Sequence, residues 1–169
     1  MRMYIALLRA VNVGGTGKLP MSELKAMCEQ AGFGKVRTFI ASGNVVFESK
    51  QTAAQVSAAL GSRLAAYAGK PVGVLVRTGE EMAAVLAANP FADEAPNRVV
   101  AIFLDEAPPA GALDRITGRN GERLALGKRE IYVHYGDGMA NSRLKIAAAT
   151  TGTARNINPV AKLAAMAVQ

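Results

Sequence analysis

The sequence predicts an α+β protein in which a ferredoxin-like βαββαβ first subdomain is followed by a smaller α+β second subdomain. Three observations support this prediction. Strand-forming apolar runs alternate with amphipathic helical stripes in that order over residues 1–78. Capping and stop residues bound the helical stripes. Half of the 169 residues are hydrophobic, which is enough to build a core and is unlike the composition of a disordered chain.

The first strand and the first helix are indicated by local signals. Residues 3–11 form an apolar run rich in strand-forming residues. Pro20 suits the first turn of a helix, and Gly32 is a typical helix stop. Leu24 and Cys28 share one stripe of this helix. We therefore expect Cys28 to be buried and unreactive.

A hairpin follows the first helix. Residues 36–40 and 45–47 are typical of strands, and Ser42-Gly43-Asn44 supplies the residues that tight turns select. We expect the first and third strands to run parallel in the centre of the sheet. The glycine-rich segment after the first strand and the turn before the third would then lie at opposite ends of the sheet.

Two further helices carry capping boxes. Thr52 with Gln55 begins the second helix, and residues 72–76 form the fourth strand. Thr78 with Glu81 then begins a connecting helix. Because the apolar stripes of the first two helices need a partner, we expect the sheet to cover them.

The second half resembles a shortened version of the first. We expect a strand, a short helix, a hairpin of two strands and two closing helices, with the first four elements at residues 99–104, 112–117, 124–126 and 131–135. Asn158 suits the N-cap of the last helix and Pro159 its first residue. The predicted organisation is a ferredoxin-like subdomain, a connecting helix with a joint, and a second α+β subdomain, at residues 1–78, 79–97 and 98–169.

The net charge of +7 is unevenly distributed. Residues 1–110 hold eleven Lys or Arg against nine Asp or Glu, whereas residues 111–169 hold nine against four. A basic protein favours anionic partners, such as phosphates, nucleotides, nucleic acid or an acidic protein. The same excess of Lys and Arg also serves surface solubility alone.

Cysteine and histidine usage limits the chemistry. Cys28 is the single cysteine and His134 the single histidine, so an intrachain disulfide is impossible and we predict no metal site. His134 alternates with apolar strand residues and is expected to be packed rather than catalytic. Every apolar run is shorter than the roughly 20 residues that cross a bilayer. The apolar start lacks a signal-peptide cleavage site, so we expect a cytoplasmic protein with no membrane contact.

Three segments taken together resemble the bacterial family called domain of unknown function 1697. They are Leu7-Leu8-Arg9-Ala10-Val11-Asn12-Val13-Gly14-Gly15, Ser42-Gly43-Asn44-Val45-Val46-Phe47 and Thr153-Ala154-Arg155-Asn156. The resemblance spans nearly the whole chain and implies two α+β subdomains, the first ferredoxin-like, without implying an activity. The sequence departs from the family pattern at Ala10, where glycine is usual, and at Ile157 and Pro159, which replace a tryptophan and a threonine. The last two changes remove a stacking or hydroxyl group near Arg155.

Candidate ligand residues in the first half are Arg9, Asn12, Gly14, Gly15 and Lys18. The glycine-rich segment that Lys18 ends lacks the glycine and hydroxyl positions of a P-loop. It still offers free N–H groups and a lysine to an anion, or it is simply a turn that needs positive φ. Arg9 shares a face of a central strand with apolar residues, so it either binds an anion or forms an ion pair.

Candidate ligand residues in the second half are Arg143, Arg155 and Asn156. Arg143 follows Ser142, which we expect to precede or begin a helix as its N-cap, and Asn156 is equally suited to a turn. Since Arg9 needs a counter-charge and the second half is strongly basic, we expect an anion to bind near the junction of the two halves. A carboxylate from the second half would make the Arg9 cluster structural instead.

Two classes of function compete. The first is binding of a small ligand that bears a phosphate or carboxylate, with or without an enzymatic step; neither catalytic residues nor a cofactor can be assigned. The second is nucleic-acid binding, for which Tyr4 stands where RNA-recognition domains of this topology place a stacking aromatic. An aromatic content of 5% supplies few stacking side chains. A protein-interaction or assembly module is a third alternative, and the oligomeric state is open.

Overall fold

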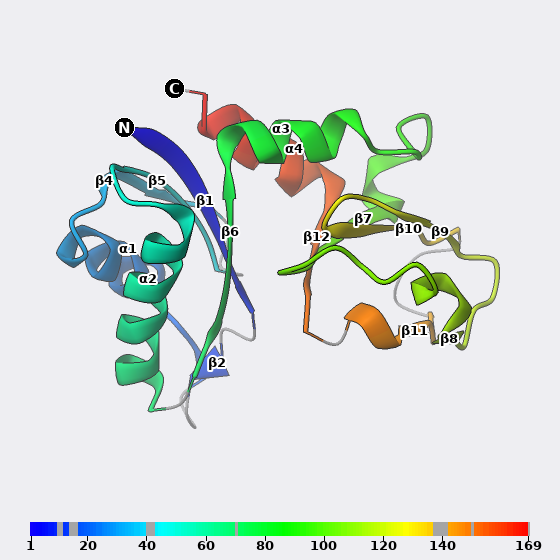
Figure 1. Cartoon of the computed structure of the whole chain (residues 1–169), viewed down its shortest axis with the longest axis horizontal. Coiled ribbons are helices and arrows are strands. Elements are labelled where there is room, and N and C mark those ends of the chain that lie inside the picture. Colours follow the sequence, from blue (N-terminus) through cyan, green and yellow to red (C-terminus); the bar gives the residue numbers. More distant parts are fainter. Residues whose placement is uncertain are drawn as a thin grey trace. The chain divides into compact units, whose positions relative to one another are not determined.

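The computed structural model describes residues 1–9, 12–13, 17–39, 43–69, 71–136, 142–149 and 151–168. These residues group into two compact units. The first unit contains Met1–Met82 and Leu163–Gln169, and the second contains Ala83–Lys162. The chain therefore returns to its first unit at the end. Figure 1 labels the elements of both units, and each unit is described separately below.

The first unit is built on a four-stranded sheet with the order β4-β5-β1-β6. Its strands and helices are β1 (Arg2–Arg9), α1 (Met21–Gln30), β4 (Gly34–Thr38), β5 (Asn44–Ser49), α2 (Ala53–Ala68) and β6 (Gly73–Thr78). A ribbon of two short strands lies between β1 and α1, formed by β2 (Asn12–Val13) and β3 (Gly17–Lys18). The order of the main elements is the predicted ferredoxin-like arrangement, which is confirmed.

The direction predicted for the central strands is wrong. β1 and β5 are the central pair, but β1 pairs antiparallel with both β5 and β6. The reason is topological. The crossover through α1 returns the chain to the starting end of β1, so β4 runs parallel to β1, and the hairpin then reverses the chain into β5. As a result, the end of β1 and the start of β5 lie at the same end of the sheet.

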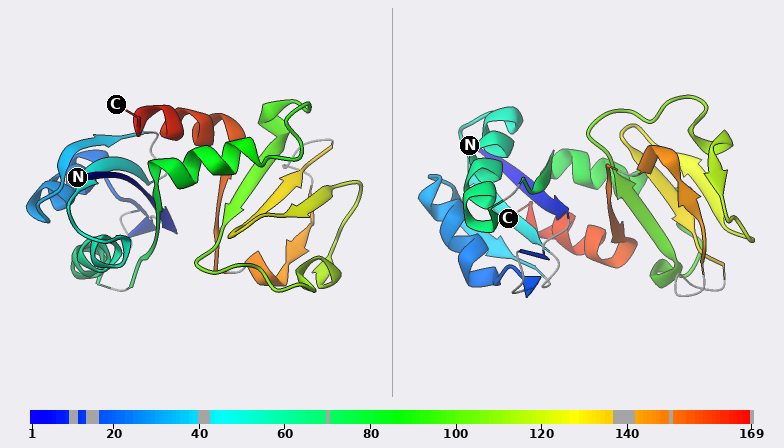
Figure 2. Two further views of the ribbon diagram at one scale, coloured as in Figure 1. Left: turned by 45° about the horizontal axis from the view of Figure 1, so that its top comes forward. Right: turned by 90° about the horizontal axis from the view of Figure 1, so that it is seen from below.

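Helices α1 and α2 cover one face of this sheet, as Figures 1 and 2 show. The predicted helix signals are confirmed. Thr52 and Gln55 form the capping box of α2, Gly69 ends α2 in a left-handed conformation, and Gly32 follows α1 with φ +91°. The core between sheet and helices contains buried side chains from every main element, among them Tyr4, Leu8, Leu24, Cys28, Phe47, Val56 and Leu60.

The centre of the other face of the same sheet is also buried. Ile5 and Leu7 are fully inaccessible although they point away from α1 and α2. The chain's last residues belong to this unit, and Gly79, at the start of α3 (Gly79–Ala87), lies against Ala167. A Cβ atom at Gly79 would come within 3.1 Å of the Ala167 Cβ. Glycine therefore permits this close approach.

The second unit contains a four-stranded sheet with the order β12-β7-β10-β9. Its strands are β7 (Val99–Phe103), β9 (Arg123–Leu126), β10 (Glu130–His134) and β12 (Thr153–Asn156), and the first three match the predicted strands. One 3₁₀ turn, η2 (Pro96–Arg98), precedes β7. One face packs on a core formed by Val100, Ile102, Leu104, Ile131, Val133 and Ile146.

Two helix predictions for the second half are wrong. Residues 112–117 contain a 3₁₀ turn, η3 (Ala112–Asp114), and a short strand, β8 (Ile116–Thr117), instead of a helix. The segment after Ser142 forms β11 (Lys145–Ile146) and the 3₁₀ turn η5 (Ala147–Ala149). The first segment supplies β8 and the second supplies β11, and the two strands pair antiparallel. This pairing between segments distant in sequence overrides the local helix signal of each.

The last helix begins earlier than predicted. α4 spans Ile157–Met166, so Asn158 and Pro159 lie inside its first turn. Asn156 Oδ1 accepts a hydrogen bond of 3.2 Å from the backbone N–H of Asn158 and thereby caps the helix. The prediction of Asn158 as N-cap is therefore wrong by two residues. Proline is still accommodated because the first turn of a helix does not need its N–H groups.

Candidate functional site

Arg9 is the last residue of β1 and is exposed. It stands opposite Gly73 on β6, and a Cβ atom at Gly73 would lie 3.1 Å from the Arg9 Cβ. The aliphatic stem of Arg9 therefore lies across a glycine on the neighbouring strand. The pleat places Arg9 on the same face as Ile5 and Leu7, as predicted.

Of the other first-half candidates, the structure describes the backbones of Asn12 and Lys18. Asn12 pairs with Lys18 in the β2–β3 ribbon, which brings their backbones together. Gly14 and Gly15 lie outside the described residues. The Leu8 N–H donates to the Gly43 carbonyl at 2.9 Å. The turn before β5 thus adjoins the end of β1, where the predicted parallel strands would have separated the two.

In the hairpin turn, Gly43 and Asn44 have structural roles. Ser42 lies outside the described residues. Gly43 has a φ of +81°, which favours glycine. Asn44 is fully buried, and its Nδ2 donates to the Phe39 carbonyl at 2.9 Å. The Gly43 conformation and the Asn44 hydrogen bond support the interpretation that these residues serve to form the turn.

Sequence reasoning missed two arginines on the sheet face that carries Arg9. Arg77 on β6 stands opposite Ile5, is 1% exposed, and donates to the Val76 carbonyl at 3.2 Å. Arg37 on β4 stands beside Val46 and donates to the Met166 carbonyl at 2.6 Å. Period-two alternation on β6 was the available signal, because it places Arg77 with Leu75 rather than with the helix-facing valines.

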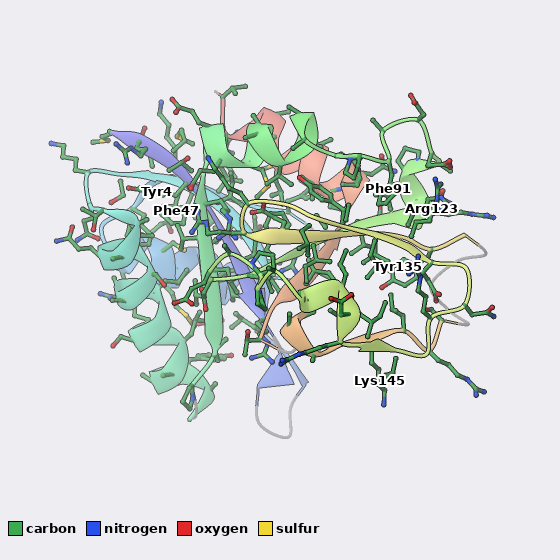
Figure 3. The ribbon with its side chains drawn as sticks, turned by 45° about the vertical axis from the view of Figure 1, so that its right-hand side comes forward. Tyr4, Phe47, Phe91, Arg123, Tyr135 and Lys145 are labelled. Atoms are coloured by element: carbon green, nitrogen blue, oxygen red, sulfur yellow. The ribbon has the colours of Figure 1, made fainter. Side chains whose placement is uncertain are left out.

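The comparison of Tyr4 with a base-stacking aromatic is wrong. Tyr4 is 1% exposed and belongs to the core between the sheet and its helices. Its ring is tilted against Phe47 at a centroid distance of 6.0 Å, and Figure 3 shows the two together. A stacking aromatic must stand on an accessible sheet face. Tyr4 cannot serve that purpose.

In the second unit, Arg143 lines a pocket of about 480 Å³ together with Thr117, Gly118, Ser142, Leu144 and Lys145. The β8–β11 pairing builds this pocket. Ile116 opposite Ile146 turns toward the core, whereas Thr117 opposite Lys145 is exposed. Arg143 and Lys145 are both exposed, and among the described residues neither has a hydrogen-bond or ion-pair partner. Two cationic side chains therefore flank the pocket.

One position in the lining of this pocket requires a glycine. Gly118 has a φ of +71°, and a Cβ atom there would lie 2.0 Å from the Arg143 carbonyl oxygen. No side chain fits at that distance. The backbone of Arg143 therefore lies directly against Gly118, which fixes the starting point of the Arg143 side chain.

A buried carboxylate holds the two walls together. Glu122 is 4% exposed and accepts hydrogen bonds from Ser142 Oγ at 2.5 Å and from the Asn120 N–H. Ser142 Oγ in turn accepts from the Leu144 N–H at 3.2 Å. The hydrogen bond from Ser142 is the main cause that lowers the pKa of Glu122 below its ordinary value, and the hydrogen bond from Asn120 is the next. Ser142 thus anchors the segment and is not a helix cap.

Arg155 is buried and engaged within β12. Its Nη1 donates to Thr153 Oγ1 at 2.6 Å and to the Ala154 carbonyl at 2.9 Å. Burial lowers the pKa of Arg155 to about 10, so the side chain remains charged at neutral pH. Asn156, the neighbouring candidate, caps α4. Arg9 belongs to the first unit and Arg143 to the second, and their convergence on one anion stays a prediction.

The single histidine is packed, as predicted. His134 is 9% exposed, and its Nε2 lies 3.5 Å from Glu94 Oε2. Glu94 Oε1 also pairs with Arg123 at 2.9 Å, and the Arg123 guanidinium lies 5.3 Å from the centre of the Phe91 ring (Figure 3). This cluster fastens the segment before η2 onto β9 and β10.

Cys28 is fully buried in α1, as predicted. Burial, together with the charge of Glu29, raises the pKa of the Cys28 thiol to about 12. The protonated thiol is a poor nucleophile and a poor metal ligand. Over the described ranges, His, Cys, Asp and Glu side chains form no group of three or more able to hold a metal ion. Nor does any helix in those ranges have the length and apolarity to span a membrane.

Comparisons with known proteins agree with this fold. A family model described as "Protein of unknown function (DUF1697)" matches residues 1–132. Among solved structures, the chain is similar to the conserved bacterial protein SP0830 from Streptococcus pneumoniae, with 25% sequence identity and a TM-score of 0.80. That match covers 98% of each chain. A search of curated proteins found no match.

Proposed function

Because the chain belongs to the DUF1697 family, whose description assigns no function, we propose from its own geometry that it binds a small ligand bearing a phosphate or carboxylate. The observation that supports this proposal is the pocket beside the β8–β11 ribbon, which carries Arg143 and Lys145. Its volume of about 480 Å³ falls within the range of small-molecule sites. Arg143 was a candidate ligand residue from the sequence alone.

The chemistry of the lining favours an anion. Arginine presents planar, paired N–H donors that match a carboxylate or phosphate, and lysine adds a second positive charge. The Glu122 carboxylate, which is bonded to the lining, accepts from Ser142 and Asn120. Its charge is thus engaged by local donors, while Arg143 and Lys145 retain theirs for a ligand.

A thermal-shift screen tests the proposal. We expect inorganic phosphate, adenosine monophosphate or citrate to raise the unfolding temperature of the parent protein. A ligand at about 100 times its Kd adds roughly 2.7 kcal/mol of apparent stability. In parallel, amide resonances of residues 142–145 are expected to shift in a nuclear magnetic resonance titration, which locates the binding.

Two matched variants provide the control. Lys145→Met should weaken the response at residues 142–145, whereas Lys128→Met should leave it unchanged, because Lys128 is an exposed lysine of the same unit outside the pocket. If none of the three compounds shifts these amides, or if Lys145→Met responds like the parent, the pocket is not an anion site.

A further inference from the structure

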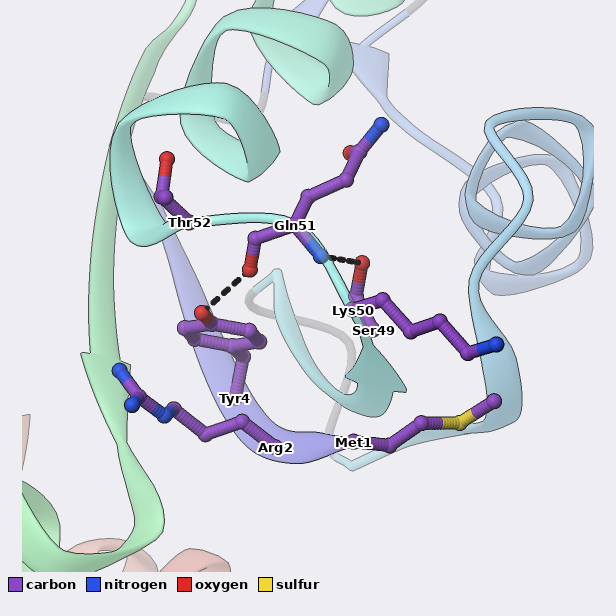
Figure 4. Close-up of a pocket in the computed structure, with 7 residues that line it drawn as sticks. All are labelled: Met1, Arg2, Tyr4, Ser49, Lys50, Gln51 and Thr52. Carbon is purple, nitrogen blue, oxygen red and sulfur yellow. Dashed lines mark hydrogen bonds between the residues drawn. The ribbon is translucent and has the colours of Figure 1, made fainter.

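The first unit contains a second pocket, of about 340 Å³, at the beginning of β1. The segment between β5 and α2 forms its other side. In the close-up of Figure 4, Arg2 and Tyr4 come from β1, Ser49 is the last residue of β5, and Lys50, Gln51 and Thr52 belong to that segment. The β1–β5 register places Arg2 opposite Ser49, which brings the two sides together.

The charged side chains that line this pocket are both basic. Arg2 and Lys50 are exposed, and within the described part of the chain neither has a hydrogen-bond or ion-pair partner. Figure 4 shows them on either side of Tyr4 and Gln51. Both positive charges attract an anion that enters the pocket.

The hydroxyl groups of Ser49 and Thr52 are left as donors. Ser49 Oγ accepts the Gln51 N–H at 3.1 Å, and Thr52 Oγ1 accepts the Gln55 N–H at 3.2 Å. A hydroxyl that accepts a hydrogen bond still carries its own proton. Among the described residues, neither proton has an acceptor. Ser49 is moreover 6% exposed, so its donor is largely withheld from bulk solvent.

The wall that carries these groups is held in place. The Tyr4 hydroxyl donates to the Gln51 carbonyl at 2.6 Å, and the Tyr4 ring is fixed in the core. Gln51 is therefore bonded through its carbonyl to Tyr4 and through its N–H to Ser49. The first turn of α2 is already capped by Thr52 and Gln55, so the affinity of the site for an anion rests on side chains and not on the helix end.

We propose that this pocket binds the phosphate group of a small phosphate monoester. A monoester carries close to two negative charges at neutral pH and three acceptor oxygens. Arg2 and Lys50 match the charge, and the protons of Ser49 and Thr52 match the oxygens. A carboxylate carries half of that charge and one oxygen fewer. The site is separate from the Arg143 pocket and does not depend on it.

The test is a titration of the full-length ¹⁵N-labelled protein with inorganic phosphate and with glucose 6-phosphate, against sodium chloride of equal ionic strength. We expect both phosphate compounds to shift the amide resonances of Gln51 and Thr52 in a saturable manner. The amides of residues 142–145 report on the other pocket. Failure of one site is therefore distinguishable from failure of the other.

The variant Arg2→Met/Lys50→Met removes both charges and should bind phosphate at least about tenfold more weakly at Gln51 and Thr52, since charge-assisted hydrogen bonds are the stronger class. The matched control is Lys25→Met, which removes an exposed lysine of α1. Equal affinity in the double variant and the parent overturns the proposal. So does an absence of saturation, or a response to a short single-stranded oligonucleotide without one to glucose 6-phosphate.

Discussion

At the scale of single residues, Gly118 is constrained by both conformation and space. Its φ of +71° disfavours any side chain, and the Arg143 carbonyl oxygen occupies the position that a Cβ would need. Gly121 offers a comparison, because its φ is +86° but nothing lies within 4 Å of its Cβ position. Comparing alanine substitutions at the two positions therefore distinguishes the free-energy cost of backbone strain from the added cost of a steric clash.

We predict that Gly118→Ala lowers the free energy of unfolding by at least about 2 kcal/mol, because strain and overpacking each cost roughly 1–3 kcal/mol. Gly121→Ala should cost about 1 kcal/mol, from strain alone. Urea denaturation of both variants measures the difference. Equal costs would mean that the Arg143 backbone moves away freely, in which case Gly118 does not fix the pocket.

Cys28 is predicted to react with a thiol reagent only when the protein unfolds. The thiol is fully buried, and its pKa of about 12 keeps it protonated at neutral pH. Labelling by dithionitrobenzoate under native conditions should be slower by orders of magnitude than labelling in urea. Rapid native labelling would show that α1 opens readily from the sheet.

Glu122 makes stability depend on pH in a defined direction. Its pKa is lowered in the folded protein from a reference value of 4.5, so the folded state favours the carboxylate. The contribution is fully present above pH 4.5 and is lost as the pH falls through the folded-state pKa. We predict that Glu122→Gln is less stable than the parent at neutral pH and that the gap narrows in acid. Urea midpoints at several pH values measure this gap.

The control for this pH series is Glu106→Gln, which changes an exposed carboxyl of the same unit. Its stability relative to the parent should stay nearly constant across the series. If the gap for Glu122→Gln is equally constant, the bonds from Ser142 and Asn120 do not favour the charged carboxyl.

At the scale of elements, Arg37 of β4 secures the end of α4. Its guanidinium donates at 2.6 Å to the carbonyl of Met166, the last residue of the helix. Cations are favourable at helix C-termini, where carbonyl groups lack partners. Arg63 donates in the same way to Gln30, the last residue of α1, but at 3.2 Å and in an exposed position.

We predict that Arg37→Met lowers the free energy of unfolding by about 1–2 kcal/mol, and that Arg63→Met lowers it by less than about 0.5 kcal/mol. Chemical denaturation provides both values. Hydrogen exchange at the last turn of α4 should accelerate in the first variant alone. An unchanged exchange rate there would mean that other contacts hold the helix end.

Elements with local signals were predictable, and elements that depend on distant pairing were not. The capping boxes of α2 and α3 lie in the sequence itself, and the structure contains both. Strands β8 and β11 have two residues each and exist because they pair across a long separation. The same limit applies to the pocket: Arg143 was a candidate, but Gly118 and Glu122 join it only through that pairing.

The strand directions were missed for a different reason. The order of the elements was predicted correctly. Once that order is known, each connection between strands fixes whether the next strand runs parallel or antiparallel to the previous one. Applying that rule to α1 and the hairpin would have placed Gly43 beside the end of β1.

At the scale of the whole molecule, the excess of basic charge is predicted to act through specific positions. The expectation that Arg9 is an anion ligand is tested by Arg9→Met, which keeps the length of the side chain and removes its charge. We expect phosphate to protect this variant less than the parent in a thermal-shift assay, and Lys25→Met to behave like the parent. If phosphate protects Arg9→Met fully, Arg9 is not a ligand.

Residues 163–168 belong to the first unit, so the first unit cannot finish folding during synthesis until the end of the chain has been made. Residues 1–82 are synthesised first, yet the carbonyl that Arg37 binds and the alanine that packs on Gly79 come from the end of the chain. Domains that are continuous in sequence fold one after another as they emerge. Here the earlier unit must wait for the later one, so its exposed sheet face persists until translation has passed residue 168.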